Sequence, residues 1–188
     1  LSHPVTVETE GSPKENPEGF ASDLTVRYEF AKRGDAEYQK PVTVYWHHGG
    51  HVPQKRPIPG VKLPGDLKLP GEAALFVGEK GIIIGDRGPG LIAILPADKF
   101  VDFKPGKLTT LPESAGHHEE WFRAIKGGPP ALSHFGYAAL LTETVLLGNV
   151  AWRAGRKLEW DATAMRAKNC PEADAWLRRE YRKGWKLV

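Results

Sequence analysis

The spacing of apolar residues changes its period once along the chain, and this change limits the folds that the sequence can adopt. In the first half, apolar residues alternate with Thr, Arg and Glu, as in residues 24–30 and 42–46, which is typical of strands with one covered face. In the second half they recur at helical spacing, as in residues 118–125. Strands followed by helices predict an α+β fold with an open, mainly antiparallel β-sheet and helices packed on one face.

Individual elements follow from the same patterns. Residues 74–86 predict two strands around the turn Gly78–Gly81, and residues 91–95 predict another, for a sheet of about five to seven strands. Residues 135–154 predict a long buried helix closed by Gly155; its Thr and Glu residues exclude a membrane span. Asn169 is placed to cap a last helix. This helix is expected to carry one apolar stripe of Ala173, Trp176, Leu177 and Tyr181.

Composition indicates one globular domain spanning residues 1–188. The chain has 188 residues, of which 40% are hydrophobic, and a formal net charge of +3. Both charge signs are interspersed, so nucleic-acid binding is not expected. The basic stretch 178–186 is interpreted as the solvated face of a C-terminal helix. The single cysteine, Cys170, excludes an internal disulfide and is interpreted as a packing residue.

The stretch YWHHGGH at residues 45–51 concentrates histidines at a strand end. Because neighbouring strand residues point to opposite faces, His47 and His48 cannot share one metal ion within the strand, and only His48 and His51 form a plausible pair. A zinc site would need further ligands from residues 117–120, where the i, i+4 histidine spacing of helical zinc motifs is missing. We therefore predict no metal site. His118 shares a helical face with Trp121, so a buried structural role and a binding role both stay open.

Nucleotide and nucleophile motifs are missing from the sequence. The stretch GDRGPG at residues 85–90 has the wrong spacing for a dinucleotide fingerprint and leads into another strand. No P-loop and no G-x-S-x-G element is present. A self-sufficient hydrolase is therefore disfavoured.

Three ordered blocks carry a resemblance to a known family. They are GHHEEWFRAIKGG, FGYAALLTETVLLGNVAWRAG and KLEWDATAMRAKNCPEADAWLRREYRKGW, and the match extends back through SHPVTVE, PVTVYWHHGG and LFVGEKGIIIGD. Together they resemble the C-terminal domain of bacterial Gfo/Idh/MocA oxidoreductases. The resemblance covers nearly the whole chain except the Pro-rich stretch 52–71.

The resemblance implies a function for the chain. Members of this family join a Rossmann domain that binds NAD or NADP to an α+β domain whose open sheet makes subunit contacts. The chain is therefore expected to be the substrate-binding and homo-oligomerisation domain of an NAD(P)-dependent oxidoreductase acting on a sugar or polyol. Hydride transfer would require the missing cofactor domain, and no catalytic residue or cofactor is expected on this fragment. Alternatives are an NAD-dependent glycosidase of the same family and a non-catalytic sugar-binding or assembly module.

The predicted substrate contacts gather around the histidine-rich stretch and the helices. Trp46 would supply an apolar platform, while His48, His51, His118 and Tyr137 would hydrogen-bond sugar hydroxyls.

Two departures from the family put these contacts in question. Relatives tend to have Tyr-Asp in place of His47-His48, and an acidic residue in place of Gly136. The first residues enter a strand pattern without an initiator Met, so we expect a piece of a longer bacterial protein. That protein would be cytoplasmic, or exported by a twin-arginine signal outside this chain.

Overall fold

The computed structural model confirms the α+β class, with two antiparallel sheets and three α-helices in its described part. It describes residues 2–10, 19, 21–51, 58, 61–65, 67–86, 90–104 and 112–185. The chain divides into two compact units, of which one combines residues 1–51 with 115–188 and the other spans residues 52–114. Each unit is described by itself.

The larger unit contains a five-stranded antiparallel sheet with the order β3-β2-β1-β7-β8. Its strands are β1 (Thr6–Glu10), β2 (Leu24–Phe30), β3 (Val42–His48), β7 (Leu158–Asp161) and β8 (Arg166–Ala167). The register places Val7 opposite both Tyr28 and Leu158, and Tyr28 opposite Val44. Directly paired residues of antiparallel strands share a face. The predicted alternation is therefore confirmed.

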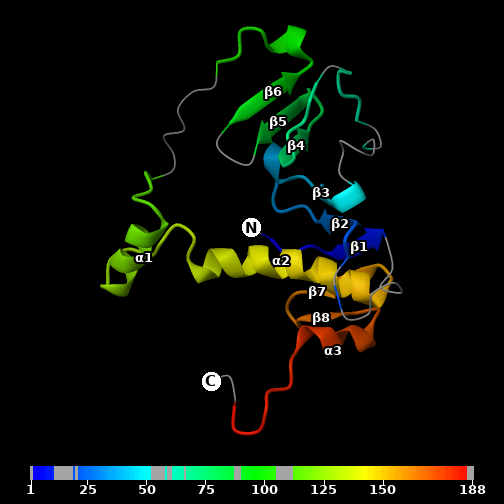
Figure 1. Cartoon of the computed structure of the whole chain (residues 1–188), viewed down its shortest axis with the longest axis vertical. Helices are drawn as coiled ribbons and strands as arrows, with labels where there is room; N and C mark the ends of the chain where they lie inside the picture. Colours follow the sequence, from blue (N-terminus) through cyan, green and yellow to red (C-terminus); the bar gives the residue numbers. More distant parts are fainter. Residues whose placement is uncertain are drawn as a thin grey trace. The chain divides into compact units, whose positions relative to one another are not determined.

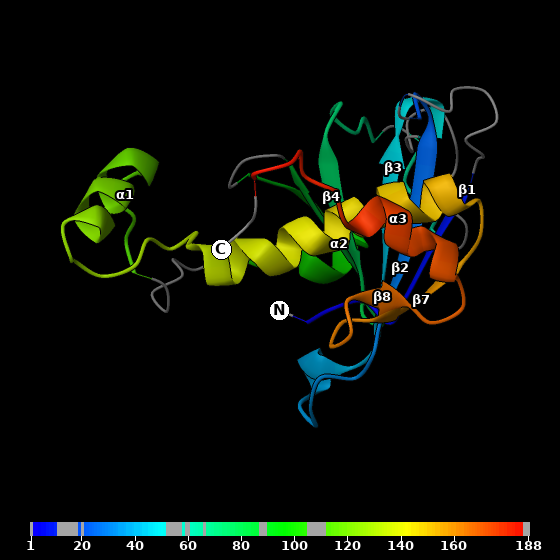
Figure 2. The ribbon, with the colours of Figure 1, turned by 90° about the horizontal axis from the view of Figure 1, so that it is seen from below.

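Helix α2 (Phe135–Ala154) covers one face of this sheet. Figure 2 shows it running across the strands, and it packs against β1. A Cβ atom added to Gly148 would lie 2.6 Å from the Tyr28 hydroxyl, so the helix and β2 approach closely at this residue. The core between α2 and the sheet is formed by Val7, Leu24, Val26, Tyr28, Leu147, Val150, Ala151, Trp152, Leu158 and Trp160.

The end of α2 matches the prediction from Gly155. This glycine has a left-handed backbone with φ of 62°, and its N–H donates to the carbonyls of Ala151 and Trp152. No helix in the described part of the chain combines the length and apolar composition needed to cross a membrane.

Burial along α2 differs from the prediction of a helix buried throughout. Its buried residues begin at Leu147, whereas Phe135, Leu141 and Val145, which precede Leu147, are exposed. The amino acids are apolar in both halves, so composition alone cannot separate them. The difference arises because only the second half lies against the sheet.

Helix α1 (His117–Ile125) begins and ends where the sequence predicts. Its C-terminal residue is followed by Lys126 and by Gly127, whose φ of 83° stops the helix. None of its residues is buried, and Trp121, Phe122 and Ile125 are all at least half exposed. The apolar stripe that predicted this helix therefore has no cover within the described part of the chain.

The C-terminal segment forms less helix than expected. A 3-10 turn, Pro171–Ala173, leads into α3 (Asp174–Leu177), and Arg178 is extended, with φ of −128° and ψ of 139°. Tyr181 and the basic residues between Arg178 and Lys183 therefore lie outside any helix, so the predicted helix was wrong for both, although these basic residues are exposed as predicted. Of the expected apolar stripe, Ala173 is fully buried and Leu177 is partly buried in the core, and the helix ends at Leu177.

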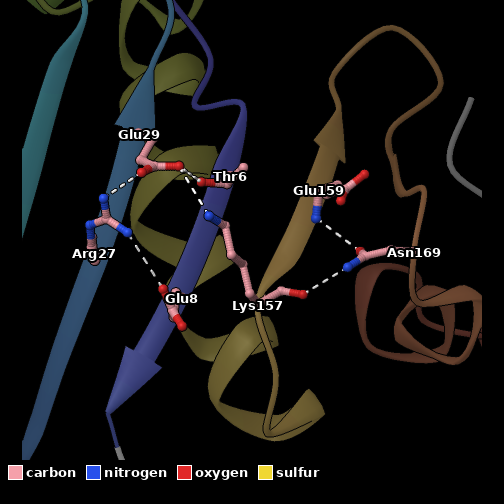
Figure 3. Close-up of polar contacts among 7 residues, drawn as sticks. All are labelled: Thr6, Glu8, Arg27, Glu29, Lys157, Glu159 and Asn169. Carbon is pink, nitrogen blue, oxygen red and sulfur yellow. Dashed lines mark hydrogen bonds and ion pairs between the residues drawn. The ribbon is translucent and has the colours of Figure 1, made fainter.

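Asn169 does not cap this helix. Its side chain accepts from the N–H of Glu159 and donates to the carbonyl of Lys157, both at 2.9 Å, and so fastens the chain to β7 (Figure 3). The helix start follows Cys170 instead. Cys170 is fully buried, and burial raises the pKa of its thiol, which confirms its role as a packing residue.

The smaller unit is a separate three-stranded sheet with the order β4-β5-β6. It comprises β4 (Ala73–Val77), β5 (Ile82–Asp86) and β6 (Leu91–Leu95), followed by the 3-10 turn Ala97–Phe100. The predicted hairpin is confirmed, since the Gly78 N–H donates to the Gly81 carbonyl at 2.9 Å. These strands do not extend the first sheet as expected, because alternation identifies strands without specifying their partners.

Candidate functional site

Strand β3 positions two of the predicted substrate-binding residues on one face. Trp46 lies opposite Val26, and His48 lies opposite Leu24, on the face that α2 covers further along the sheet. Val26 is 2% exposed, whereas Trp46 is 59% exposed and His48 is also exposed. The two side chains therefore continue the apolar face beyond the part that α2 covers.

The other face of β3 carries a second aromatic pair that sequence reasoning did not assign to a site. Tyr45 and His47 stack with ring centroids 6.1 Å apart, and the His47 ring is 3.2 Å from the Thr25 hydroxyl. This confirms that His47 and His48 point to opposite faces. The alternation of β3 was the signal that could have found this pair.

The Gly-Gly turn after His48 has a structural role. Gly49 has φ of 64°, and the Gly50 N–H donates to the Asp23 carboxylate. A Cβ atom on Gly49 would lie 2.0 Å from the Ser22 carbonyl oxygen, so a larger residue does not fit there. The turn continues into the 3-10 helix Gly49–His51, and the side chain of His51 lies outside the described part of the structure.

The remaining predicted residues lie on helices. His118 is in the first turn of α1 and is exposed, so the buried alternative for this residue is wrong. Tyr137 is in the first turn of α2 and is about half exposed. Figures 1 and 2 both show α1 apart from β3. Trp46 and His48 therefore lie close together, but His118 does not lie beside them. The shared site stays a prediction.

The carboxylates of α1 have structural partners. Glu119 accepts from Arg123 at 2.7 Å, one helical turn away, and Glu120 accepts from the Leu132 N–H at 2.9 Å. Both lie in the first turn, where negative charge suits the helix dipole. These contacts give Glu119 and Glu120 structural roles in and beside α1.

The described residues form neither a metal site nor a phosphate site of a known kind. Among the described residues, no group of three or more His, Cys, Asp or Glu side chains is placed to hold a metal ion. The stretch from Asp86 to Gly90 joins β5 to β6, and the Asp86 carboxylate accepts from the Gly90 N–H at 3.1 Å. Gly90 leads directly into β6 and not into a helix, whereas a dinucleotide pyrophosphate binds at a helix N-terminus that follows such a turn.

A polar network occupies the sheet face opposite α2, as Figure 3 shows. Glu29 accepts from the Thr6 hydroxyl at 2.5 Å, from Arg27 at 2.5 Å and from Lys157 at 3.2 Å. Arg27 also pairs with Glu8 at 3.6 Å. The Thr6 hydroxyl, followed by Lys157, lowers the pKa of Glu29. The outward Thr, Arg and Glu positions of the strands predicted a polar face, but not these pairings.

A second group that the sequence did not identify centres on Glu143 of α2. Its carboxylate oxygen accepts from the Trp160 indole at 2.8 Å and contacts the His3 ring at 2.9 Å. Glu143 interrupts an otherwise apolar helix, and this was the available signal. The group connects the first residues, α2 and β7, so we assign it a structural role in the core.

Two surface hollows are lined by residues outside β3. One of about 720 Å³ surrounds α3 and the residues after it, and one of about 460 Å³ lies beside the hairpin between β2 and β3. Neither is lined by a predicted substrate-binding residue. We therefore base the site on the exposed face of β3 and not on a cavity.

Comparison with known proteins adds no assignment: no model of a known protein family matches the chain, and no curated protein is significantly similar to it.

Proposed function

We propose that the chain is the substrate-binding and oligomerisation domain of an NAD(P)-dependent oxidoreductase that acts on a sugar or polyol. The proposal rests on the Gfo/Idh/MocA resemblance of its three sequence blocks. The α+β class with a sheet covered on one face is the architecture that this resemblance implies. The observation that carries the substrate assignment is the exposed pair of Trp46 and His48 on β3.

The chemistry of this pair suits a polyhydroxylated ligand. A sugar presents an apolar C–H face and a rim of hydroxyls, and an exposed indole offers a flat apolar surface of matching size. His48 lies two residues from Trp46 on the same face, where its ring nitrogens can donate to and accept from hydroxyls. Trp46 would position the ring of the ligand, and His48 would select its hydroxyl pattern.

The polar sheet face supports the second part of the proposal. Thr6, Arg27, Glu29 and Lys157 form a connected network on the face that α2 leaves open. The charges in this network are paired, so a second copy could cover it without burying an isolated charge. We propose this face as a contact between subunits.

The described residues do not fit a dinucleotide, because Gly90 of the glycine-rich stretch leads into strand β6 and not into a helix. NAD or NADP would therefore bind outside this chain. The contribution of the chain to hydride transfer would be to hold and orient the substrate.

Titration calorimetry with a panel of sugars and polyols tests the proposal. We expect at least one ligand to bind, and Trp46→Ala or His48→Ala to weaken its binding about tenfold or more. Trp121→Ala is the matched control, because Trp121 is 57% exposed but lies on α1. We expect this variant to bind like the unchanged chain, and neither protein to bind NAD or turn over the ligand.

Three results would contradict the proposal. The first is that no member of the panel binds. The second is that Trp121→Ala weakens binding as much as Trp46→Ala. The third is micromolar binding of NAD by this chain, which would overturn the assignment of the cofactor to another domain.

A further inference from the structure

Strand β3 forms one edge of the five-stranded sheet. In the described part of the chain it pairs with β2 alone, over all seven of its residues. An edge strand presents a row of backbone N–H and C=O groups that can pair with another strand. Because β3 has seven residues, this row of backbone groups extends over seven residues.

Proteins usually protect such an edge with charged side chains, proline or a short strand, and β3 has none of these features in its own residues. Residues 42–48 contain no Lys, Arg, Asp, Glu or Pro. Val44 and Trp46 are exposed on one face, and Tyr45 is exposed on the other. The opposite edge of the sheet differs, because β8 has only two residues and one of them is Arg166. Protection is therefore present at one edge and missing at the other.

The sequence of β3 is also compatible with pairing to itself. Tyr45 is the central residue of Val42–His48. Antiparallel pairing about a two-fold axis through Tyr45 would place Val44 opposite Trp46 of a second copy, and Val42 opposite its His48. These residues already share the face of β3 that pairs with the covered side of β2. The register therefore keeps apolar residues together and meets no charge on either strand.

We propose that two copies of this chain associate through antiparallel pairing of β3 with β3 about a two-fold axis at Tyr45. The sheet then continues from one copy into the other. This contact uses the strand edge and is separate from the proposed contact through the polar sheet face. It does not depend on the substrate assignment, although it would bring the Trp46 surfaces of two copies onto one continuous face.

Cysteine cross-linking under mild oxidation tests this register. In an antiparallel pair, opposite Cα atoms lie about 4.5–5.5 Å apart, which falls within the range of about 4.4–6.8 Å that a disulfide spans. Tyr45→Cys should therefore form a linked dimer, because this residue meets its own copy at the axis. The native Cys170 is fully buried and does not compete.

Two further variants separate this arrangement from other contacts. Val44→Cys alone should not cross-link, whereas a mixture of Val44→Cys with Trp46→Cys should give the mixed dimer. Val101→Cys is the control for random collision, because Val101 is an exposed valine outside any strand. The proposal is overturned if Tyr45→Cys cross-links no more than this control, or if Val44→Cys links to itself as readily as to Trp46→Cys.

Light scattering on the chain provides an independent test without cysteines. Val44→Lys places a charge on the edge strand but not on the polar face, and it should weaken association at least tenfold. Val101→Lys adds the same charge outside any strand and should leave the mass unchanged. Equal masses for the unchanged chain and Val44→Lys would contradict edge pairing, while a loss of association in Arg27→Ala alone would assign the contact to the polar face.

Discussion

Strands β2 and β3 pair residue by residue and have the same alternation, but their apolar residues have different surroundings. Val26 on β2 is almost fully buried, while Trp46, its direct partner on β3, is mostly exposed. Helix α2 approaches β2 at Gly148, where an added Cβ atom would lie within 3.3 Å of Tyr28 and Val26. The comparison shows that alternation determines which face a side chain is on, whereas the neighbouring element determines whether it is covered.

Helix α2 repeats this difference along its own length. Leu147 and Ala151 are buried against the sheet, whereas Leu141 and Val145 are exposed on a stretch of similar composition. Exposed apolar residues grouped in this way are typical of surfaces that another molecule covers. The uncovered part of β3 is the region to which we assign both the sugar and the second copy.

The largest effect on stability is expected from a buried tryptophan, and an exposed tryptophan serves as its comparison. Trp160→Ala removes a side chain that is 5% exposed and whose indole donates to Glu143, so it should lower the free energy of unfolding by about 3–5 kcal/mol. Trp46→Ala removes an exposed side chain and should change it by no more than about 0.5 kcal/mol. Urea unfolding of both variants measures the difference. Similar losses in both would show that β3 is covered in solution.

A smaller effect is expected from two glycines of α2. Gly148→Ala would place its Cβ 2.6 Å from the Tyr28 hydroxyl and within 3.3 Å of both Val26 methyl groups, so it should destabilise the fold by about 1–3 kcal/mol. Gly136→Ala meets only the exposed ring of His134 and should stabilise the helix by up to about 1 kcal/mol. Thermal unfolding of the two variants gives the sign of each change. Destabilisation by both would place the first turn of α2 against another element.

The smallest effect appears only at high pH. Burial raises the pKa of Tyr28 from 10.0 to about 12. The folded state therefore favours the neutral phenol. Its contribution to stability is complete below pH 10 and is lost as the pH rises through about 12. Tyr28→Phe should remove this part of the decrease in the free energy of unfolding at high pH. Urea unfolding at several pH values measures the decrease. The same pH dependence in both proteins would contradict burial of the hydroxyl.

Much of the fold follows from the sequence because local patterns specify it. Alternation identifies β2 and β3, and helical spacing followed by glycine identifies α1 and the end of α2. The separate sheet of residues 73–95 could not be predicted in this way, because pairing between strands depends on the whole chain. The short α3 and the role of Asn169 were also missed. Asn169 bonds to β7, which is distant in sequence, and α3 ends at Leu177 although the apolar spacing continues.

The site was predictable to a smaller extent. The positions of Trp46 and His48 on one face follow from their spacing on β3, and the structure confirms these positions. Their exposure does not follow, since it depends on where α2 crosses the sheet. Whether His118 and Tyr137 lie near this face depends on where the helices pack. The spacing of apolar residues does not specify where helices pack. The pairing of Glu143 with Trp160 and His3 depends in the same way on the tertiary fold.

The most direct test of the account is an NMR titration of the tryptophan indole N–H groups with the sugar or polyol that binds in calorimetry. The chain has six tryptophans, and assignment by single substitutions separates their signals. The account predicts that the Trp46 signal shifts with ligand concentration, while the signals of Trp121 and of the buried Trp160 stay in place. Binding without a shift at Trp46 would contradict the assignment of the exposed face of β3 as the substrate surface.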